Sequence, residues 1–126
     1  MDNNRKVLIV EDNELNMKLF KDILESEGCT VIQCFDPMFA LESISKEKPN
    51  LILMDIQLPR ISGFDLIQWI KGDANISHIP IIAITAFAME DDKEKILSLG
   101  CDGYMSKPIS MDPFIENVNK FLKKSS

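Results

Sequence analysis

The sequence predicts an α/β domain in which helices pack on a parallel β-sheet. Five short apolar runs recur along the chain, and segments whose apolar residues have helical spacing separate them. Three of the runs are almost continuously apolar, which is typical of central parallel strands covered on both faces. The chain has 126 residues, enough for one domain with its own core and short for two.

The predicted strands follow the apolar runs in chain order. They are KVLIV at 6–10, TVIQCF at 30–35, NLILM at 50–54, IPIIAIT at 79–85 and DGYMS at 102–106. The first, third and fourth runs predict central strands because they contain few polar residues. TVIQCF mixes polar and apolar residues, so we place it nearer an edge of the sheet.

The predicted helices lie between these strands and after the last one. The first ends before Gly28, the second begins at the capping pair Asp36 and Pro37 and ends by Pro49, and the third ends by Gly72. Helical spacing assigns the following residues to the core: Leu15, Leu19, Phe20, Ile23, Leu24, Ala40, Leu41, Ile44, Phe64, Ile67, Ile70, Phe114, Ile115, Val118, Phe121 and Leu122. The helix at 90–99 is the weakest prediction, because the charged run MEDDKEK dilutes its apolar residues and indicates a solvated, movable element.

Composition excludes several classes of function. Hydrophobic residues make up 45% and charged residues 27%, as in ordinary globular domains. The net charge of -6 repels nucleic-acid phosphates, so we expect no nucleic-acid partner. The apolar run VLIV near the N-terminus is too short for a signal peptide or a membrane span. We therefore expect a cytoplasmic protein without membrane insertion.

The cysteine and histidine pattern does not predict a disulfide framework or a zinc site. Cys29, Cys34 and Cys101 form no C-x-x-C pair, so we expect three buried thiols. His78 is the only histidine, which excludes a metal cage built on histidines. We assign His78 to packing in a loop or at a helix end.

Charged and hydroxyl side chains gather where the predicted strands end. Glu11 and Asp12 follow the first strand, Asp55 follows LILM, Thr85 ends the fourth strand, and Lys107 follows the fifth. Ligands of open parallel α/β sheets bind outside the carboxyl ends of the strands. The sequence therefore predicts three carboxylates, a hydroxyl and an ammonium group at one edge of the sheet.

A cluster of three carboxylates, a hydroxyl and an ammonium group can bind a cation and accept a phosphoryl group. Two carboxylates about 4 Å apart repel by about 4 kcal/mol at an effective dielectric constant of about 20, so the cluster requires a cation or shifted pKa values. Oxygen ligands without histidine or cysteine favour Mg²⁺. A carboxylate such as Asp55 can attack a phosphoryl group, while Lys107 and Thr85 offset charge on the transferred oxygens.

Each residue also has an ordinary structural interpretation. Asp55 can cap the next turn or helix, and Glu11 and Asp12 can stabilise the N-terminus of the first helix. Thr85 is a common strand residue, and Lys107 can be an exposed lysine. Only the combination favours phosphoryl chemistry.

This combination resembles the receiver domain of bacterial two-component response regulators. The resemblance spans about Lys6 to Leu122 and rests on EDNELNMKLF, LILMDIQLP, ITAFAM and YMSKPIS. These runs are most similar to single-domain members that act in cell-division control. The resemblance implies a flavodoxin-like, doubly wound five-stranded parallel sheet with strand order 2-1-3-4-5 and five helices, as in chemotaxis receivers.

The resemblance also implies the site. Asp55 would be the phosphoacceptor for a histidine kinase, and Glu11, Asp12, Asp55 and the backbone carbonyl of Gln57 would hold Mg²⁺. Thr85 and Lys107 would contact the phosphoryl group. Thr85 and Tyr104 would switch conformation, and the peptide bond between Lys107 and Pro108 would be cis.

The same resemblance implies the output and the partners. The readout face would comprise the helix at 90–99, the last strand and the last helix, including Phe87, Met89, Tyr104 and Met105. We expect histidine kinases or phosphatases, phosphotransfer proteins or cell-cycle regulators as partners, with recruitment to a cell pole implied. Residues 1–126 would form one receiver without an output domain, because few residues follow Leu122.

We expect a signalling protein and not an enzyme, apart from weak hydrolysis of its own aspartyl phosphate. Gln57 and Phe87 would flank the path of the hydrolytic water, with Phe87 slowing access. A Mg²⁺-dependent phosphohydrolase is the main alternative, but its D-x-D motif requires an acid where Gln57 stands. A flavin- or nucleotide-binding domain requires a phosphate cradle where EDNELN places two acids.

Overall fold

The computed structural model describes residues 5–57, 61–86 and 90–122, with residues 90–93 described by their backbone alone. Within these ranges five parallel strands form one sheet in the order β2-β1-β3-β4-β5, so the predicted order is confirmed. The strands are β1 (Lys6–Val10), β2 (Thr30–Cys34), β3 (Leu51–Asp55), β4 (Ile81–Thr85) and β5 (Gly103–Ser106). TVIQCF forms an edge strand, as its mixed composition predicts.

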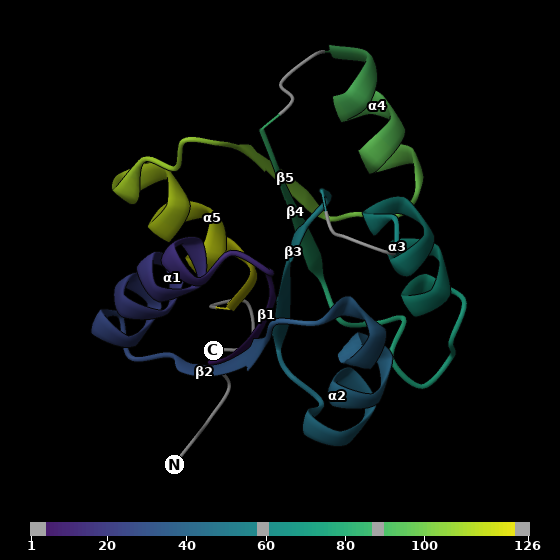
Figure 1. Cartoon of the computed structure of the whole chain (residues 1–126), viewed down its shortest axis with the longest axis horizontal. Coiled ribbons are helices and arrows are strands. Elements are labelled where there is room, and N and C mark those ends of the chain that lie inside the picture. Colours follow the sequence, from purple (N-terminus) through teal and green to yellow (C-terminus); the bar gives the residue numbers. More distant parts are fainter. Residues whose placement is uncertain (1–4, 58–60, 87–89, 123–126) are drawn as a thin grey trace.

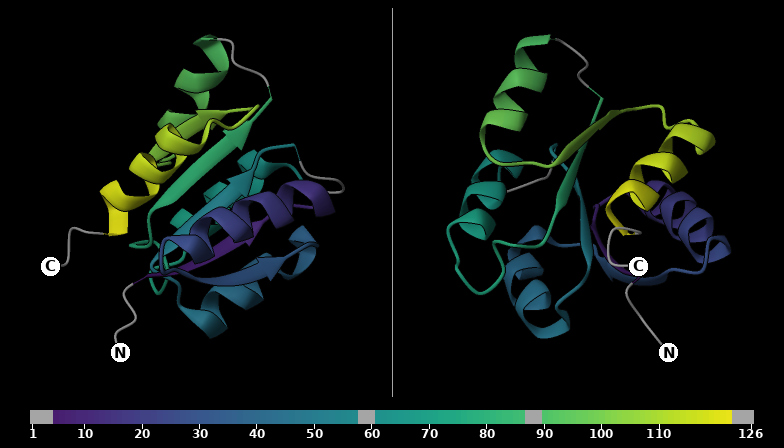
Figure 2. Two further views of the ribbon diagram at one scale, coloured as in Figure 1. Left: turned by 90° about the vertical axis from the view of Figure 1, so that its left-hand side faces the viewer. Right: turned by 180° about the vertical axis from the view of Figure 1, so that it is seen from behind.

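Helices cover both faces of the sheet. They are α1 (Glu14–Ser26), α2 (Ala40–Glu47), α3 (Gly63–Lys71), α4 (Glu90–Ser98) and α5 (Met111–Leu122). Figures 1 and 2 show α1 and α5 together on one face, and α2 and α3 on the other with α4 beyond them. Two separate apolar clusters fill the spaces between the sheet and these two layers. The fold is therefore the predicted doubly wound α/β arrangement.

The start of the second helix differs from the prediction in detail. The Asp36 side chain accepts a hydrogen bond from the Met38 N–H at 2.9 Å, so it is a cap as predicted. It caps the short 3₁₀ helix η1 (Pro37–Phe39), however, and the α-helix begins only at Ala40. The helix ends before Pro49, where Lys48 takes a left-handed conformation with φ 47°.

The prediction that Leu15 and Leu19 belong to the core is wrong. Their exposed fractions are 80% and 46%, whereas Ile23 in the same i, i+4 row is buried. The buried stripe of α1 instead runs through Met17, Phe20 and Leu24. Leu15 and Leu19 lie at the margin of that stripe, because a helix buries only the narrow face that meets the sheet.

Strand register brings the carboxyl ends of four strands to one edge. Val10 pairs with Met54, Asp55 with Ile84, and Thr85 with Ser106. The residues that follow β1 and β5 therefore lie close to the ends of β3 and β4.

The three cysteines are free and buried, which confirms their prediction as buried thiols. His78 is exposed in the turn region between α3 and β4. Among the described residues, no helix has the length and apolar character needed to cross a membrane.

Candidate functional site

Asp55 is the last residue of β3, and the residue is only 3% exposed. Its Oδ1 accepts a hydrogen bond from the Gln57 N–H at 2.9 Å, and its Oδ2 accepts one from Lys107 Nζ at 3.1 Å. The first bond caps the turn after β3, but α3 is capped by Ser62, not by Asp55. The central strand thus delivers a buried carboxylate to a lysine that is 52 residues away in sequence.

Glu11 lies directly after β1 and is 1% exposed. Its Oε2 accepts a hydrogen bond from the Asn13 N–H at 3.1 Å. Its Oε1 has no hydrogen-bond partner among the described residues, and Lys107 Nζ lies 3.6 Å away. Burial, followed by the charge of Asp55, raises the pKa of Glu11 from 4.5 to about 7. Within the described part of the chain, this buried carboxylate oxygen thus has an ion pair with Lys107 but no hydrogen bond.

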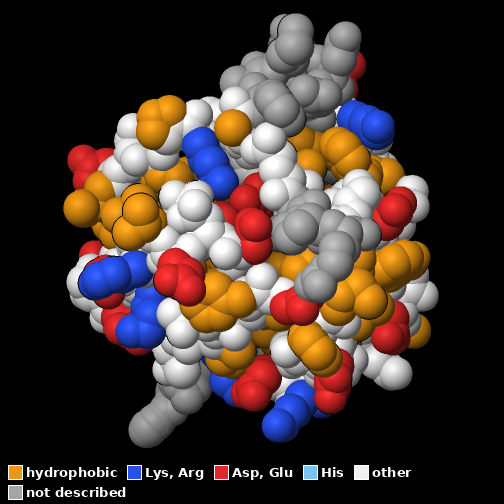
Figure 3. Space-filling view, in the orientation of Figure 1, with side chains coloured by type: hydrophobic (Ala, Val, Ile, Leu, Met, Phe, Trp, Pro, Cys, Tyr) orange, Lys and Arg blue, Asp and Glu red, His pale blue; other side chains and the backbone are white. Residues whose placement is uncertain are grey.

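The acidic cluster fits a divalent cation. Glu11, Asp12 and Asp55 each offer a carboxylate oxygen, and these oxygens all lie within 4.8 Å of one another. Figure 3 shows acidic side chains gathered near the middle of this face, beside a basic side chain. Hard oxygen donors are the ligands that Mg²⁺ prefers, and a cation here would satisfy Glu11 Oε1.

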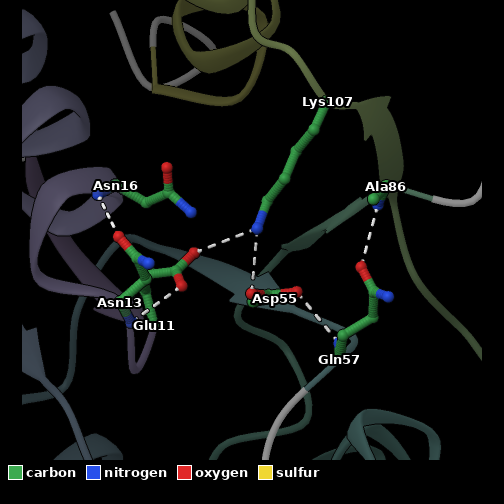
Figure 4. Close-up of polar contacts among 7 residues, drawn as sticks. All are labelled: Glu11, Asn13, Asn16, Asp55, Gln57, Ala86 and Lys107. Atoms are coloured by element: carbon green, nitrogen blue, oxygen red, sulfur yellow. Dashed lines mark hydrogen bonds and ion pairs between the residues drawn. The ribbon is translucent and has the colours of Figure 1, made fainter.

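Lys107 and Thr85 complete the site from the other side. The Lys107 N–H donates to the Thr85 carbonyl oxygen at 2.8 Å, which ties the segment after β5 to the end of β4. Thr85 is buried, and Lys107 Nζ reaches both Glu11 and Asp55 (Figure 4). The peptide bond between Lys107 and Pro108 is cis.

Two backbone groups at the site were missed from the sequence. The Asn13 N–H holds Glu11, while the Asn13 side chain caps α1 by accepting from the Asn16 N–H at 2.9 Å. The Ala86 N–H donates to the Gln57 side-chain oxygen at 3.1 Å. Asn at a helix start signals only the side-chain cap on α1. Neither backbone contact has a sequence signal, because every residue except proline supplies an N–H.

The structure describes only some of the residues predicted to form the switch and its readout face. Tyr104 is half-buried on β5 and packs against the cluster under α2 and α3, and Met105 is buried. On α4, Ile96 is buried and Leu97 is exposed. Phe87 and Met89 lie outside the described residues.

Comparisons with known proteins agree with this geometry. Residues 7–119 match the response regulator receiver domain family. The polar-differentiation response regulator DivK of Brucella anthropi is 50% identical over 118 residues, which cover 94% of this chain and 96% of the relative.

Two solved structures are similar throughout. A Francisella response regulator receiver domain has a TM-score of 0.89 and 29% identity, covering 97% of this chain and 99% of that one. The receiver domain of a Pseudomonas aeruginosa sensor histidine kinase was solved with magnesium coordinated in its active-site cleft. It has a TM-score of 0.86 and 30% identity, and the match covers 95% of this chain and 98% of that one. Sequence match, strand order and strand-end site together show that this chain belongs to the response regulator receiver domain family.

Proposed function

We propose that Asp55 accepts a phosphoryl group from a histidine kinase and that this modification switches a protein-binding surface. The observation that carries the proposal is the placement of the Asp55 carboxylate. It is buried at the end of the central strand, contacts Lys107 Nζ, and has Glu11 and Asp12 beside it. A carboxylate with a structural role alone would not require two further acids and a buried Glu11 oxygen that has an ion pair with Lys107 but no hydrogen bond among the described residues.

The transfer forms a P–O bond to an Asp55 carboxylate oxygen and breaks the P–N bond of a phosphohistidine. The leaving histidine nitrogen keeps the electron pair. Lys107, which contacts Asp55 Oδ2 before transfer, offsets charge on the phosphoryl oxygens, and the Thr85 hydroxyl donates a hydrogen bond to one of them.

Glu11, Asp12, Asp55 and the backbone carbonyl of Gln57 are the proposed Mg²⁺ ligands. Support comes from the convergence of three carboxylate oxygens and from the buried Glu11 oxygen that no described residue hydrogen-bonds. When bound, Mg²⁺ would neutralise charge on the acids and on the phosphoryl oxygens. The magnesium coordinated in the active-site cleft of the related kinase receiver supports Mg²⁺ as the ion.

The proposed switch passes from Thr85 and Tyr104 to the face formed by α4, β5 and α5. An added phosphoryl group carries about -1.5 to -2 charges, enough to bias such a surface in a dry site.

We propose one receiver over residues 1–126 whose output is protein contact. Its partners would be histidine kinases or phosphatases, phosphotransfer proteins or cell-cycle regulators. The likeness to polar-differentiation regulators supports a role in cell division and recruitment to a cell pole.

Intact-mass measurement after incubation with acetyl phosphate tests the proposal. Wild-type protein should gain one phosphoryl group only when Mg²⁺ is present, and Asp55→Asn should gain none. An adduct that persists in Asp55→Asn, or no adduct on folded wild-type protein, contradicts the proposal.

A turnover assay separates this function from the phosphohydrolase alternative. Gln57 occupies the position of the second acid of that class, and its amide cannot act as a general acid and base. We therefore expect no multiple turnover of p-nitrophenyl phosphate. Sustained Mg²⁺-dependent hydrolysis would favour the enzyme instead.

A further inference from the structure

Three large apolar side chains are exposed together in the turn that follows β2. The exposed fractions are 43% for Phe35, 58% for Met38 and 57% for Phe39. We call these three residues the β2–α2 patch. In Figure 3 apolar side chains lie beside acidic ones over the region that Figure 1 labels α2. Because β2 and β5 are opposite edges of the sheet, the patch lies away from the face formed by α4, β5 and α5.

The turn that carries the patch is held in one conformation. Pro37 is buried beneath it. The Asp36 side chain accepts from the Met38 N–H at 2.9 Å, and the Asp36 carbonyl oxygen accepts from the Phe39 N–H at 3.0 Å. A partner that binds here therefore has little backbone to order, which lowers the cost of association.

Carboxylates lie around the patch. Asp36 lies within it, and Glu42 is exposed in the first turn of α2, one turn beyond Phe39. Asp12 is exposed just after β1, which pairs with β2. The lysine of α2, Lys46, lies in the last turn, away from the patch. The surface therefore combines apolar anchors with negative charge.

Area and charge together distinguish the possible occupants. An aromatic side chain can bury about 200 Å², so three half-exposed side chains present on the order of 300 Å², a size at which apolar patches are often functional. A second copy of this chain would bring like charges together, because each copy has a net charge of -6 and the same acids around the patch. The same acids repel an anionic lipid surface. A cationic protein segment matches both the apolar anchors and the carboxylates.

We propose that Phe35, Met38 and Phe39 form a docking site for a basic amphipathic helix of a partner protein. The apolar stripe of that helix would cover the patch, and lysine or arginine side chains at its margins would lie near the surrounding carboxylates. This surface is separate from the proposed output face, and its occupation does not require phosphorylation of Asp55.

Two synthetic helical peptides test the docking site on the whole chain. One has leucines at helical spacing and lysines elsewhere, and the other has glutamate in place of each lysine. We expect the leucine–lysine peptide to bind and to shift the NMR signals of Phe35, Met38 and Phe39, and the leucine–glutamate peptide not to bind. Binding that shifts signals of α1 or α5 instead would overturn the proposal.

Matched substitutions test whether the patch supplies the affinity. Met38→Ser combined with Phe39→Ser should weaken binding of the leucine–lysine peptide about tenfold or more, because two anchors are lost. Met111→Ser removes a methionine on α5 with the same exposed fraction, 58%, and should bind as wild type does. Urea unfolding should show little change in stability, since all three positions are exposed. Equal weakening by the two variants would contradict the proposal.

Charge variants test the basic character of the occupant. Asp36→Asn keeps the cap, since Asn also caps helices, and removes the charge. Combined with Glu42→Gln, it should weaken binding about three- to tenfold at low salt, with a smaller difference at high salt. An affinity that depends on neither the two charges nor salt would overturn the assignment of a basic partner.

Sedimentation of the wild-type protein alone tests the other occupant. We expect no association through the patch, whereas a dimer that Met38→Ser with Phe39→Ser abolishes would assign the patch to a second copy. The same variant should be phosphorylated by acetyl phosphate at the wild-type rate. Failure of wild type to accept a phosphoryl group would overturn the proposed function and leave the docking site standing.

Discussion

Each end of the sheet has a cluster of lysine and carboxylate side chains, but the two clusters differ in how fully their charges are matched. At the amino end, Lys71 Nζ donates to the carbonyl oxygens of Ser77 and Ile79 and contacts Asp102 Oδ2 at 3.3 Å. The same Asp102 oxygen accepts from the Ile81 N–H at 2.9 Å. At the carboxyl end, Lys107 is shared between two buried carboxylates, and its contact with Glu11 Oε1 is an ion pair at 3.6 Å, with no hydrogen bond to that oxygen from any described residue.

The cluster around Lys71 therefore stabilises the fold, whereas the cluster around Lys107 belongs to the candidate site. The Lys71 cluster ties the end of α3 to the starts of β4 and β5, and its charges are matched by donors and acceptors. The Lys107 cluster has more negative than positive charge, which destabilises the unliganded protein and leaves room for a cation or a phosphoryl group. Substitutions at the two ends should therefore affect different observables.

The largest expected effect is on phosphoryl transfer. Lys107→Met should slow phosphorylation of Asp55 by about a thousandfold, or about 4 kcal/mol, because no other described cation reaches Asp55 Oδ2. Intact mass against time with acetyl phosphate measures the rate. Lys71→Met is the matched control and should react at the wild-type rate. Equal slowing by both variants would remove the distinction between the two ends.

Glu11→Gln should raise the stability of the metal-free protein. The pKa of Glu11 in the folded protein is raised to about 7, so the folded state holds its proton more tightly than the unfolded state. The resulting stability is present at pH values below about 4.5 and is lost as pH rises through about 7.

Urea unfolding in EDTA measures this effect. At pH 8 Glu11→Gln should be more stable than wild type by about 3 kcal/mol, with a much smaller difference at pH 4.5. Added Mg²⁺ should stabilise wild type more than the variant. A difference that does not change with pH would show that the Glu11 charge is not the cause.

Lys71→Met should destabilise the protein by about 2 kcal/mol, because two carbonyl oxygens and Asp102 lose a donor while the aliphatic packing is kept. Lys46→Met, at an exposed position on α2, is the control and should change the free energy of unfolding little. If the two variants have the same stability, the amino-end cluster contributes nothing to the scaffold.

Asn13→Ala should produce the smallest effect, a loss of about 1 kcal/mol from removal of the α1 cap. Asn13→Ser should retain most of this stability, since Ser also caps helices. Both variants keep the backbone N–H that holds Glu11. Thermal unfolding with and without Mg²⁺ measures the effect, and a loss of Mg²⁺ stabilisation in Asn13→Ala would assign the side chain to the site.

Local sequence patterns were enough to predict much of the architecture. Apolar runs marked the strands, and the mixed run TVIQCF marked an edge strand, because burial on two faces demands continuous apolar residues. Asp36 was recognised as a cap from its side-chain chemistry, but the 3₁₀ turn that it begins was not. Leu15 and Leu19 fitted the helical spacing, yet the position of the sheet left them exposed.

The sequence by itself determined which side chains end the strands, because the side chains after each apolar run are set by chain order. It thereby determined that Glu11, Asp55 and Lys107 meet at one edge. Only the tertiary structure decided how they are paired. The partner of Lys107 Nζ, the Glu11 oxygen that no described residue hydrogen-bonds and the contact of Gln57 with Ala86 depend on strand register and side-chain rotamers. These are set by packing between segments that are distant in sequence, and no local pattern encodes them.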